Sequence, residues 1–144
     1  MVKVMIVEDD FMIADMAEEL LERAGYTVCG IARCLSEAVT LSMDHQPEIV
    51  LMDFQLADGE TGIDIARGLR RAGRPGILYV TGNADQVMRT GSEGDGCLVK
   101  PYRPDELLRS LEVVAELQAT GVATPPFPKN LHLLRRGAVP ASVA

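Results

Sequence analysis

Cysteine is scarce in this sequence, and no cysteine lies in a motif that would give it a function. Cys29, Cys34 and Cys97 are an odd number, and they form neither a CxxC pair nor a spacing with histidine that suits a metal. We therefore interpret all three as reduced packing residues.

Positive charge is also in short supply. The 144 residues include 14 lysines and arginines against 21 aspartates and glutamates, which gives a formal net charge of −7. Non-specific binding to DNA needs a surplus of basic side chains on one face, so this balance argues against a nucleic acid partner. The arginines at positions 67–74 are most simply the solvated side of a helix, and those at 135–136 form only a small basic spot.

Long apolar runs are missing as well. No stretch approaches the roughly 20 residues that a membrane span needs, and the first residues enter a strand-like run without the segment order of a signal peptide. The length and the 47% hydrophobic content are typical of one globular domain. We therefore expect a soluble, cytoplasmic protein with one compact domain.

Short apolar runs of strand length are present, and they alternate with segments of helical periodicity. The strand-like runs are residues 3–7, 27–32, 49–52, 77–80 and 97–99, and the helix-like segments are 10–24, 36–46, 62–72, 84–90 and about 104–118. Ser36 and Asp10 are the expected capping residues of their helices. Continuously apolar strands are buried on both faces, so five such units predict an α/β fold, a doubly wound parallel sheet covered by helices.

Beyond about residue 120 the composition changes. Four prolines fall in this part of the chain, at positions 125, 126, 128 and 140, and nothing in it could make a second core. We predict one domain over residues 1–120 and a proline-containing tail over residues 121–144, in which the short segment 131–134 could pack back on the domain.

Polar side chains follow four of the five predicted strands. Glu8 and Asp9 follow the first, Asp53 the third, Thr81 the fourth and Lys100 the fifth. In a parallel sheet the loops at the carboxyl ends of the strands form the ligand crevice. Singly, each residue has an ordinary role as a turn, cap or strand end, but their joint placement predicts one site.

The residue types suit phosphoryl chemistry. The carboxylates of Glu8, Asp9 and Asp53 could hold a hard divalent cation such as Mg²⁺, which leaves coordination positions for phosphate oxygens. Asp53 is the expected nucleophile, because a carboxylate can form an aspartyl phosphate. The Lys100 ammonium and the Thr81 hydroxyl could each bind an oxygen of the transferred group.

These residues resemble the pattern of the receiver domains of two-component response regulators. In that family an acidic pair follows the first strand, the phosphorylated Asp ends the third, a Thr or Ser ends the fourth, and Lys-Pro ends the fifth; here these are Glu8-Asp9, Asp53, Thr81 and Lys100-Pro101. The resemblance covers about residues 1–118. It implies a flavodoxin-like sheet with strand order 2-1-3-4-5, a cis Lys100-Pro101 peptide, and the backbone carbonyl of Gln55 as a further Mg²⁺ ligand.

The resemblance also implies a function. Asp53 would accept a phosphoryl group from a histidine kinase or a histidine phosphotransfer protein in a Mg²⁺-dependent reaction. The protein would then be a phosphoacceptor in signalling and not an enzyme acting on a separate substrate. We expect no DNA-binding or catalytic output module, so that output would be a conformational switch read by an unidentified protein partner, or a phosphorelay.

The sequence departs from the family pattern at several positions. Cys97 stands where the family's switch aromatic is common, Ala57 stands where a proline is frequent, and Gly62 comes one position late. The run Tyr79-Val80-Thr81-Gly82 is similar to the Phe-Ala-Thr-Gly of the single-domain FATGUY subgroup, which often lacks that aromatic, although Asn83 departs from the subgroup motif.

Two hypotheses follow from these departures. Tyr79 or Tyr102 could replace the missing aromatic. The helix at residues 84–90 has few apolar side chains and glycines behind it, at positions 91, 94 and 96, so we predict that it has low local stability and reorganises on phosphorylation.

Three other functions are alternatives to a phosphoacceptor. A phosphatase with an Asp nucleophile expects a second acid two residues later, where Gln55 stands. A flavodoxin-like electron carrier would bind a flavin phosphate after the first strand, where the acids at positions 8–10 would repel it. A pseudo-receiver, which binds partners without being phosphorylated, stays open as the main alternative because the switch aromatic is absent.

Overall fold

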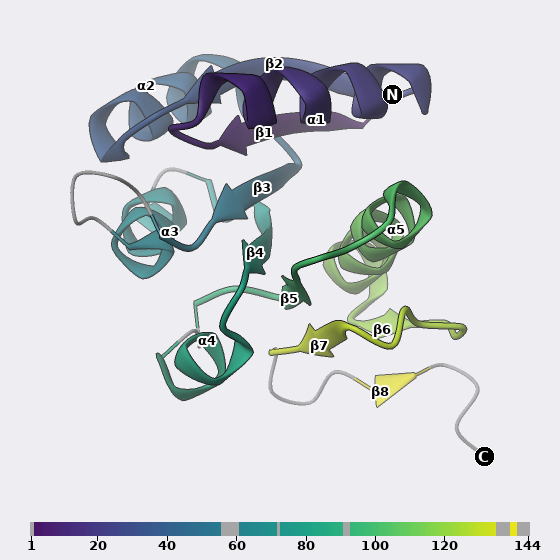
Figure 1. Cartoon of the computed structure of the whole chain (residues 1–144). Coiled ribbons are helices and arrows are strands. Elements are labelled where there is room, and N and C mark those ends of the chain that lie inside the picture. The colour runs from purple at the N-terminus through teal and green to yellow at the C-terminus, as the bar shows by residue number, and fades with distance from the viewer. Residues whose placement is uncertain (1, 56–60, 72, 91–92, 135–138, 141–144) are drawn as a thin grey trace.

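The computed structural model describes residues 2–55, 61–71, 73–90, 93–134 and 139–140. Strands and helices alternate along the chain (Figure 1). The strands are β1 (Lys3–Val7), β2 (Thr27–Ala32), β3 (Ile49–Asp53), β4 (Gly76–Thr81) and β5 (Gly96–Val99), and the helices are α1 (Phe11–Arg23), α2 (Leu35–His45), α3 (Gly62–Arg71), α4 (Ala84–Thr90) and α5 (Pro104–Thr120). These five strands pair in parallel in the order 2-1-3-4-5, so the predicted flavodoxin-like fold is confirmed.

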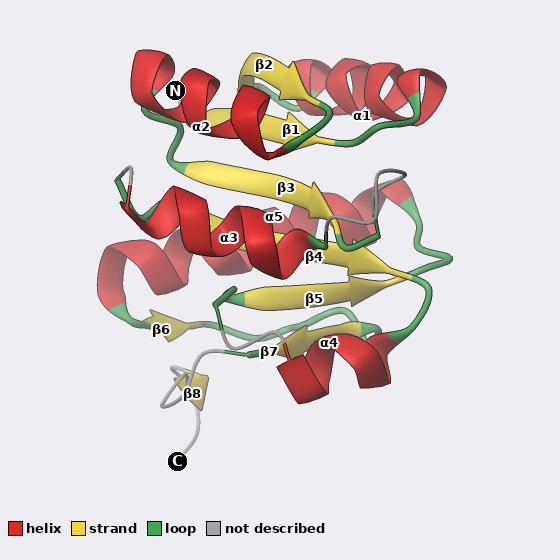
Figure 2. Ribbon diagram, turned by 90° about the vertical axis from the view of Figure 1, so that its left-hand side faces the viewer, coloured by secondary structure: helices red, strands yellow, loops and turns green. Residues whose placement is uncertain are grey.

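The helices cover both faces of the sheet and bury two separate apolar cores. On one face α1 and α5 pack against strand residues such as Ile6 and Leu78, and on the other α2, α3 and α4 pack against residues such as Met5 and Tyr79. Successive strand residues therefore serve opposite cores. Figure 2 shows the parallel strands running in one direction, so that their carboxyl ends meet along one edge.

The helix ends follow largely from local chemistry. The Asp10 carboxylate accepts hydrogen bonds from the N–H groups of Met12 and Ile13 at 3.0 and 3.2 Å, so Asp10 caps α1 as predicted. The prediction that Ser36 caps α2 is wrong. The helix begins one residue earlier, at Leu35, with Cys34 in the capping position.

The second helix starts early because another side chain binds the preceding backbone. The Glu37 carboxylate, in the first turn of α2, accepts a hydrogen bond from the Arg33 N–H at 2.8 Å. This contact organises the entry into the helix without a capping hydroxyl.

The segment after α5 contributes further strands. β7 (Leu131–Leu133) adds to the main sheet antiparallel to β5, which makes the sheet order 2-1-3-4-5-7. The short strands β6 (Val122–Ala123) and β8 (Val139–Pro140) pair with each other. Both views place β7 along the outer edge of β5.

Several residues named from the sequence lie outside the described ranges, namely Ala57 and its neighbours at 56–60, Ala72, Gly91, and the arginines at 135–136. Within the described part of the chain, no helix combines the length and the apolar character that crossing a membrane requires.

Candidate functional site

Three carboxylates meet at the carboxyl ends of neighbouring strands. Glu8 and Asp9 directly follow β1, and Asp53 is the last residue of β3, which pairs with β1 in parallel. One carboxylate oxygen from each residue lies within 4.8 Å of the others. Oxygen ligands at this spacing could hold a hard divalent cation such as Mg²⁺.

The carboxylate of Glu8 is the most deeply buried of the three. Its residue is only 6% exposed, while Asp9 and Asp53 are half-buried. Burial and, to a smaller extent, the nearby charge of Asp53 together raise the pKa of Glu8 to about 7, although a hydrogen bond from the Asp10 N–H partly opposes the shift. A cation bound among these groups would favour the ionised carboxylates.

A positive charge faces the same carboxylates. The Lys100 ammonium, from the loop after β5, lies 3.9 Å from the nearer carboxylate oxygen of Asp53. This separation is longer than the roughly 2.7–2.9 Å of a charge-assisted hydrogen bond, so the ammonium is near Asp53 without being tightly bonded to it. The Lys100-Pro101 peptide is cis, as the family resemblance implied.

Thr81 ends β4 beside these groups and is buried. Its hydroxyl oxygen accepts a hydrogen bond from the Asn83 N–H at 3.0 Å, and the hydroxyl is 3.4 Å from the Asn83 carbonyl. The next residue, Gly82, has open space where a side chain would start. The surface beside Thr81 is therefore accessible to a small group.

Gln55 lies against Asp53 through its backbone. The Gln55 N–H donates to an oxygen of the Asp53 carboxylate at 3.3 Å, and its side-chain amide donates to Gln86 of α4 at 2.8 Å. The predicted role of its carbonyl as a cation ligand stays a prediction. The bond to Gln86 is a contact that the sequence did not indicate, and it links the site to α4.

The space at the site is small. A cavity of about 30 Å³ lies under it, lined on the polar side by Glu8, Asp53 and Lys100 and closed by Tyr102 among others. This volume is comparable to one water molecule. The cavity can therefore hold no more than a group of about that size.

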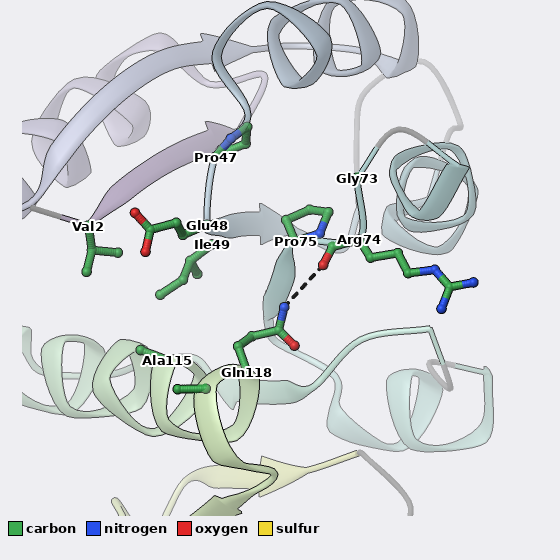
Figure 3. Close-up of a pocket in the computed structure, with 10 residues that line it drawn as sticks. Val2, Pro47, Glu48, Ile49, Gly73, Arg74, Pro75, Ala115 and Gln118 are labelled. Carbon is green, nitrogen blue, oxygen red and sulfur yellow. Dashed lines mark hydrogen bonds between the residues drawn. The ribbon is translucent and has the colours of Figure 1, made fainter.

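A larger cavity lies at the opposite, amino-terminal end of the strands (Figure 3). It measures about 390 Å³ and lies between the starts of β3 and β4 and the last turns of α5. Glu48 and Arg74 lie on opposite sides of this cavity. The Gln118 side chain donates a hydrogen bond to the Arg74 carbonyl at 3.2 Å. The cluster of carboxylates and ammonium belongs to the other end of the sheet.

Tyr79 fills the space beside the small residue Cys97. The two residues are register partners on β4 and β5, and Tyr79 is fully buried with its ring edge-on to Phe54 at 5.5 Å between centroids. Gly62 and Gly94 lie against opposite edges of the ring, where an added Cβ would crowd it. The Tyr79 hydroxyl is buried and has no hydrogen-bond partner among the described residues.

Tyr102, the other aromatic of the hypothesis, lies at the site itself. Burial raises the pKa of its hydroxyl, and the charges of Glu8 and Asp53 add to the effect. The structure therefore places Tyr79 next to Cys97, where the family's aromatic would stand, and Tyr102 at the mouth of the site.

Comparison with known proteins agrees with this geometry. Residues 4–112 match the family described as the response regulator receiver domain. The chain belongs to the response regulator receiver family. Its receiver domain carries the acidic cluster and the strand-end Thr and Lys at the positions described above.

Individual relatives support the same assignment. The phyllosphere-induced regulator PhyR of Methylorubrum extorquens is 31% identical over 105 residues, which are 71% of this chain and 39% of that protein. The sensory transduction protein LytT of Bacillus anthracis is 30% identical over 115 residues, or 78% of this chain and 46% of that protein. The chain thus spans about half the length, or less, of these curated relatives.

Solved structures show the same fold. A receiver domain of a modulated diguanylate cyclase from Desulfovibrio desulfuricans G20 has a TM-score of 0.73 at 30% identity and covers 83% of this chain and 97% of its own. PhyR from Bartonella quintana, described as an anti-anti-sigma factor, has a TM-score of 0.69 at 31% identity, covering 83% of this chain and 49% of its own.

Proposed function

We propose that this receiver domain accepts a phosphoryl group on Asp53, from a histidine kinase or a histidine phosphotransfer protein, in a Mg²⁺-dependent reaction. One observation carries the proposal: the Asp53 carboxylate lies both in a three-carboxylate cluster and 3.9 Å from the Lys100 ammonium. A nucleophile at this position has carboxylates beside it that can bind a cation and an ammonium beside it that can bind phosphate oxygens.

Each group has a definable part in the transfer. Glu8, Asp9 and Asp53 would hold Mg²⁺, which when bound offsets the negative charge of the phosphoryl group. An Asp53 oxygen attacks phosphorus, so a P–O bond forms as the P–N bond to the donor imidazole breaks, and that imidazole takes up a proton. Lys100 binds one phosphoryl oxygen.

Thr81 would connect the site to its surroundings. To donate to a phosphoryl oxygen, its hydroxyl proton must turn away from the Asn83 carbonyl oxygen, which lies 3.4 Å from the hydroxyl, and Asn83 leads into α4. Among the side chains described in α4, only Val87 is buried, so little packing opposes a shift of this helix. We propose that α4 reorganises on phosphorylation and that a protein partner reads the change.

The proposed role is that of a phosphoacceptor and not of an enzyme with a separate substrate. The partner is open within this proposal. Because PhyR of Bartonella quintana, a relative at 31% identity, is described as an anti-anti-sigma factor, a component of a sigma-factor circuit is the first candidate to test by binding assays with both forms of the protein.

The direct test is phosphorylation with acetyl phosphate and Mg²⁺, followed by intact-protein mass. The wild type should gain one phosphoryl group only when Mg²⁺ is present, Asp53→Asn should gain none, and Asp44→Asn, which changes an exposed acid on α2, should behave as the wild type. If the wild type gains no phosphoryl group, the proposal fails and the pseudo-receiver, which Cys97 in place of the switch aromatic favours, becomes the better description.

A further inference from the structure

Asn130, in the segment after α5, contacts the end of β5 next to the site. The Val99 N–H donates to the Asn130 carbonyl at 3.0 Å, and the Asn130 side-chain amide donates to the Val99 carbonyl at 3.0 Å. Val99 is the last residue of β5 and directly precedes Lys100. Both backbone groups of the residue before Lys100 are therefore bonded to Asn130.

The other side of the same backbone is held by β4. The Lys100 N–H donates to the Thr81 carbonyl at 2.7 Å, and Val99 is the register partner of Thr81. The end of β5 is thus clamped between Thr81 and Asn130. The backbone position from which the Lys100 side chain extends depends on both contacts.

The segment is anchored independently of this clamp. Leu131 is only 9% exposed in the core that α1 and α5 share, and Phe127 and Leu133 pack against that core. The Leu134 N–H donates to the Asp95 carbonyl at 3.0 Å, and the Arg109 guanidinium on α5 donates to the Pro126 carbonyl at 2.9 Å. Apolar burial and hydrogen bonds therefore fix where Asn130 stands.

We propose that Asn130 is a positioning residue for Lys100, so that docking of segment 121–134 and phosphoryl binding at Asp53 strengthen each other. This inference rests on the proposed phosphoacceptor function. The Lys100 side chain is long and 39% exposed. The position of its ammonium near Asp53 therefore depends on how firmly the backbone of Lys100 is held. Since coupling between two sites is reciprocal, a bound phosphoryl group must favour the docked segment by the same factor.

The first test measures beryllofluoride affinity in the presence of Mg²⁺, with beryllofluoride as the phosphoryl mimic. Asn130→Ala removes the side-chain bond to the Val99 carbonyl and leaves the backbone bond, and we expect affinity to fall about three- to ten-fold, the effect of one hydrogen bond. Mg²⁺ affinity without beryllofluoride should be unchanged, because the clamp acts on Lys100 and not on the three carboxylates. A general loss of structure would instead lower the affinities for beryllofluoride and for Mg²⁺ together.

His132→Ala is the matched control. It removes a half-buried side chain from β7 without changing the bonds to Val99, and it should bind beryllofluoride as the wild type does. If Asn130→Ala binds as tightly as His132→Ala, the positioning role is overturned while the phosphoacceptor function stands.

A second measurement uses the wild type alone and so does not depend on a variant folding. Beryllofluoride with Mg²⁺ should slow hydrogen exchange at the Val99 and Leu134 amides, which donate across the contact between β5 and β7, and Mg²⁺ alone should not. Unchanged exchange in the loaded protein would overturn the coupling. A wild type that does not bind beryllofluoride at all would overturn the proposed function, and this inference with it.

Discussion

Replacing Gly94 with alanine should destabilise the protein, because the space that the new methyl group needs is already filled. An added Cβ would overlap the ring of Tyr79, which is fully buried. The ring cannot move aside, since Gly62 lies against its opposite edge and Phe54 packs against it edge-on. Gly94 does not have a positive φ, so the cost comes from packing and not from the backbone.

The size of the effect follows from this confinement. Adding a methyl group to a well-packed core costs about 1–3 kcal/mol, and the overlap with a fixed ring favours the upper half of that range. For a domain of this length, 1 kcal/mol corresponds to roughly 3–4 °C in Tm. We therefore expect Gly94→Ala to lower Tm by about 6–12 °C in thermal unfolding followed by circular dichroism.

The chain offers a matched control for this experiment. An added Cβ at Gly82 meets no atom within 4 Å, so Gly82→Ala should change the free energy of unfolding by less than about 0.5 kcal/mol. Combining Gly94→Ala with Tyr79→Leu should cost less than the two single changes together, because a smaller side chain frees the space. Equal stability of Gly94→Ala and Gly82→Ala would refute the account of packing around Tyr79.

Three further predictions concern single side chains. Folding raises the pKa of Glu8 to about 7, so the protonated carboxyl stabilises the fold at low pH and this stability is lost as pH rises from about 4.5 to 7. Between pH 5 and pH 8 the free energy of unfolding should therefore fall more in the wild type than in Glu8→Gln. At pH 8, Mg²⁺ should restore the free energy of unfolding of the wild type. Tyr79→Phe removes a buried hydroxyl without a partner and should raise the free energy of unfolding in urea by about 1 kcal/mol; a decrease would mean that the hydroxyl is satisfied. Asp10→Ala removes the cap of α1 and should cost about 1 kcal/mol in the same assay, whereas Asp10→Asn should cost less because its side chain still accepts.

The order of elements and the location of the site could be predicted from local patterns. Continuous apolar runs require burial on both faces, and polar residues at the ends of parallel strands must meet at one edge of the sheet. These two rules suffice to bring Asp9, Asp53 and Lys100 together. They do not indicate that Glu8 is the buried member of the acidic group, because its depth depends on packing from other elements.

The contact made by Asn130 could not be predicted in the same way. Asn130 and Val99 are 31 positions apart, and the run Leu131-His132-Leu133 is too short to indicate a strand. That strand exists because the edge of β5 offers unpaired backbone groups and the α5 core accepts Leu131. Such tertiary effects override weak local preference.

The antiparallel strand β7 has a consequence for how copies of this protein behave at high concentration. An uncovered sheet edge is a template on which another chain can add, and this is a common start of aggregation. With β7 in place, the β5 side of the sheet presents a strand of only three residues. Conditions that detach β7 while the rest stays folded should therefore make the protein aggregate before it unfolds. On heating, light scattering should rise before the helical circular dichroism signal is lost.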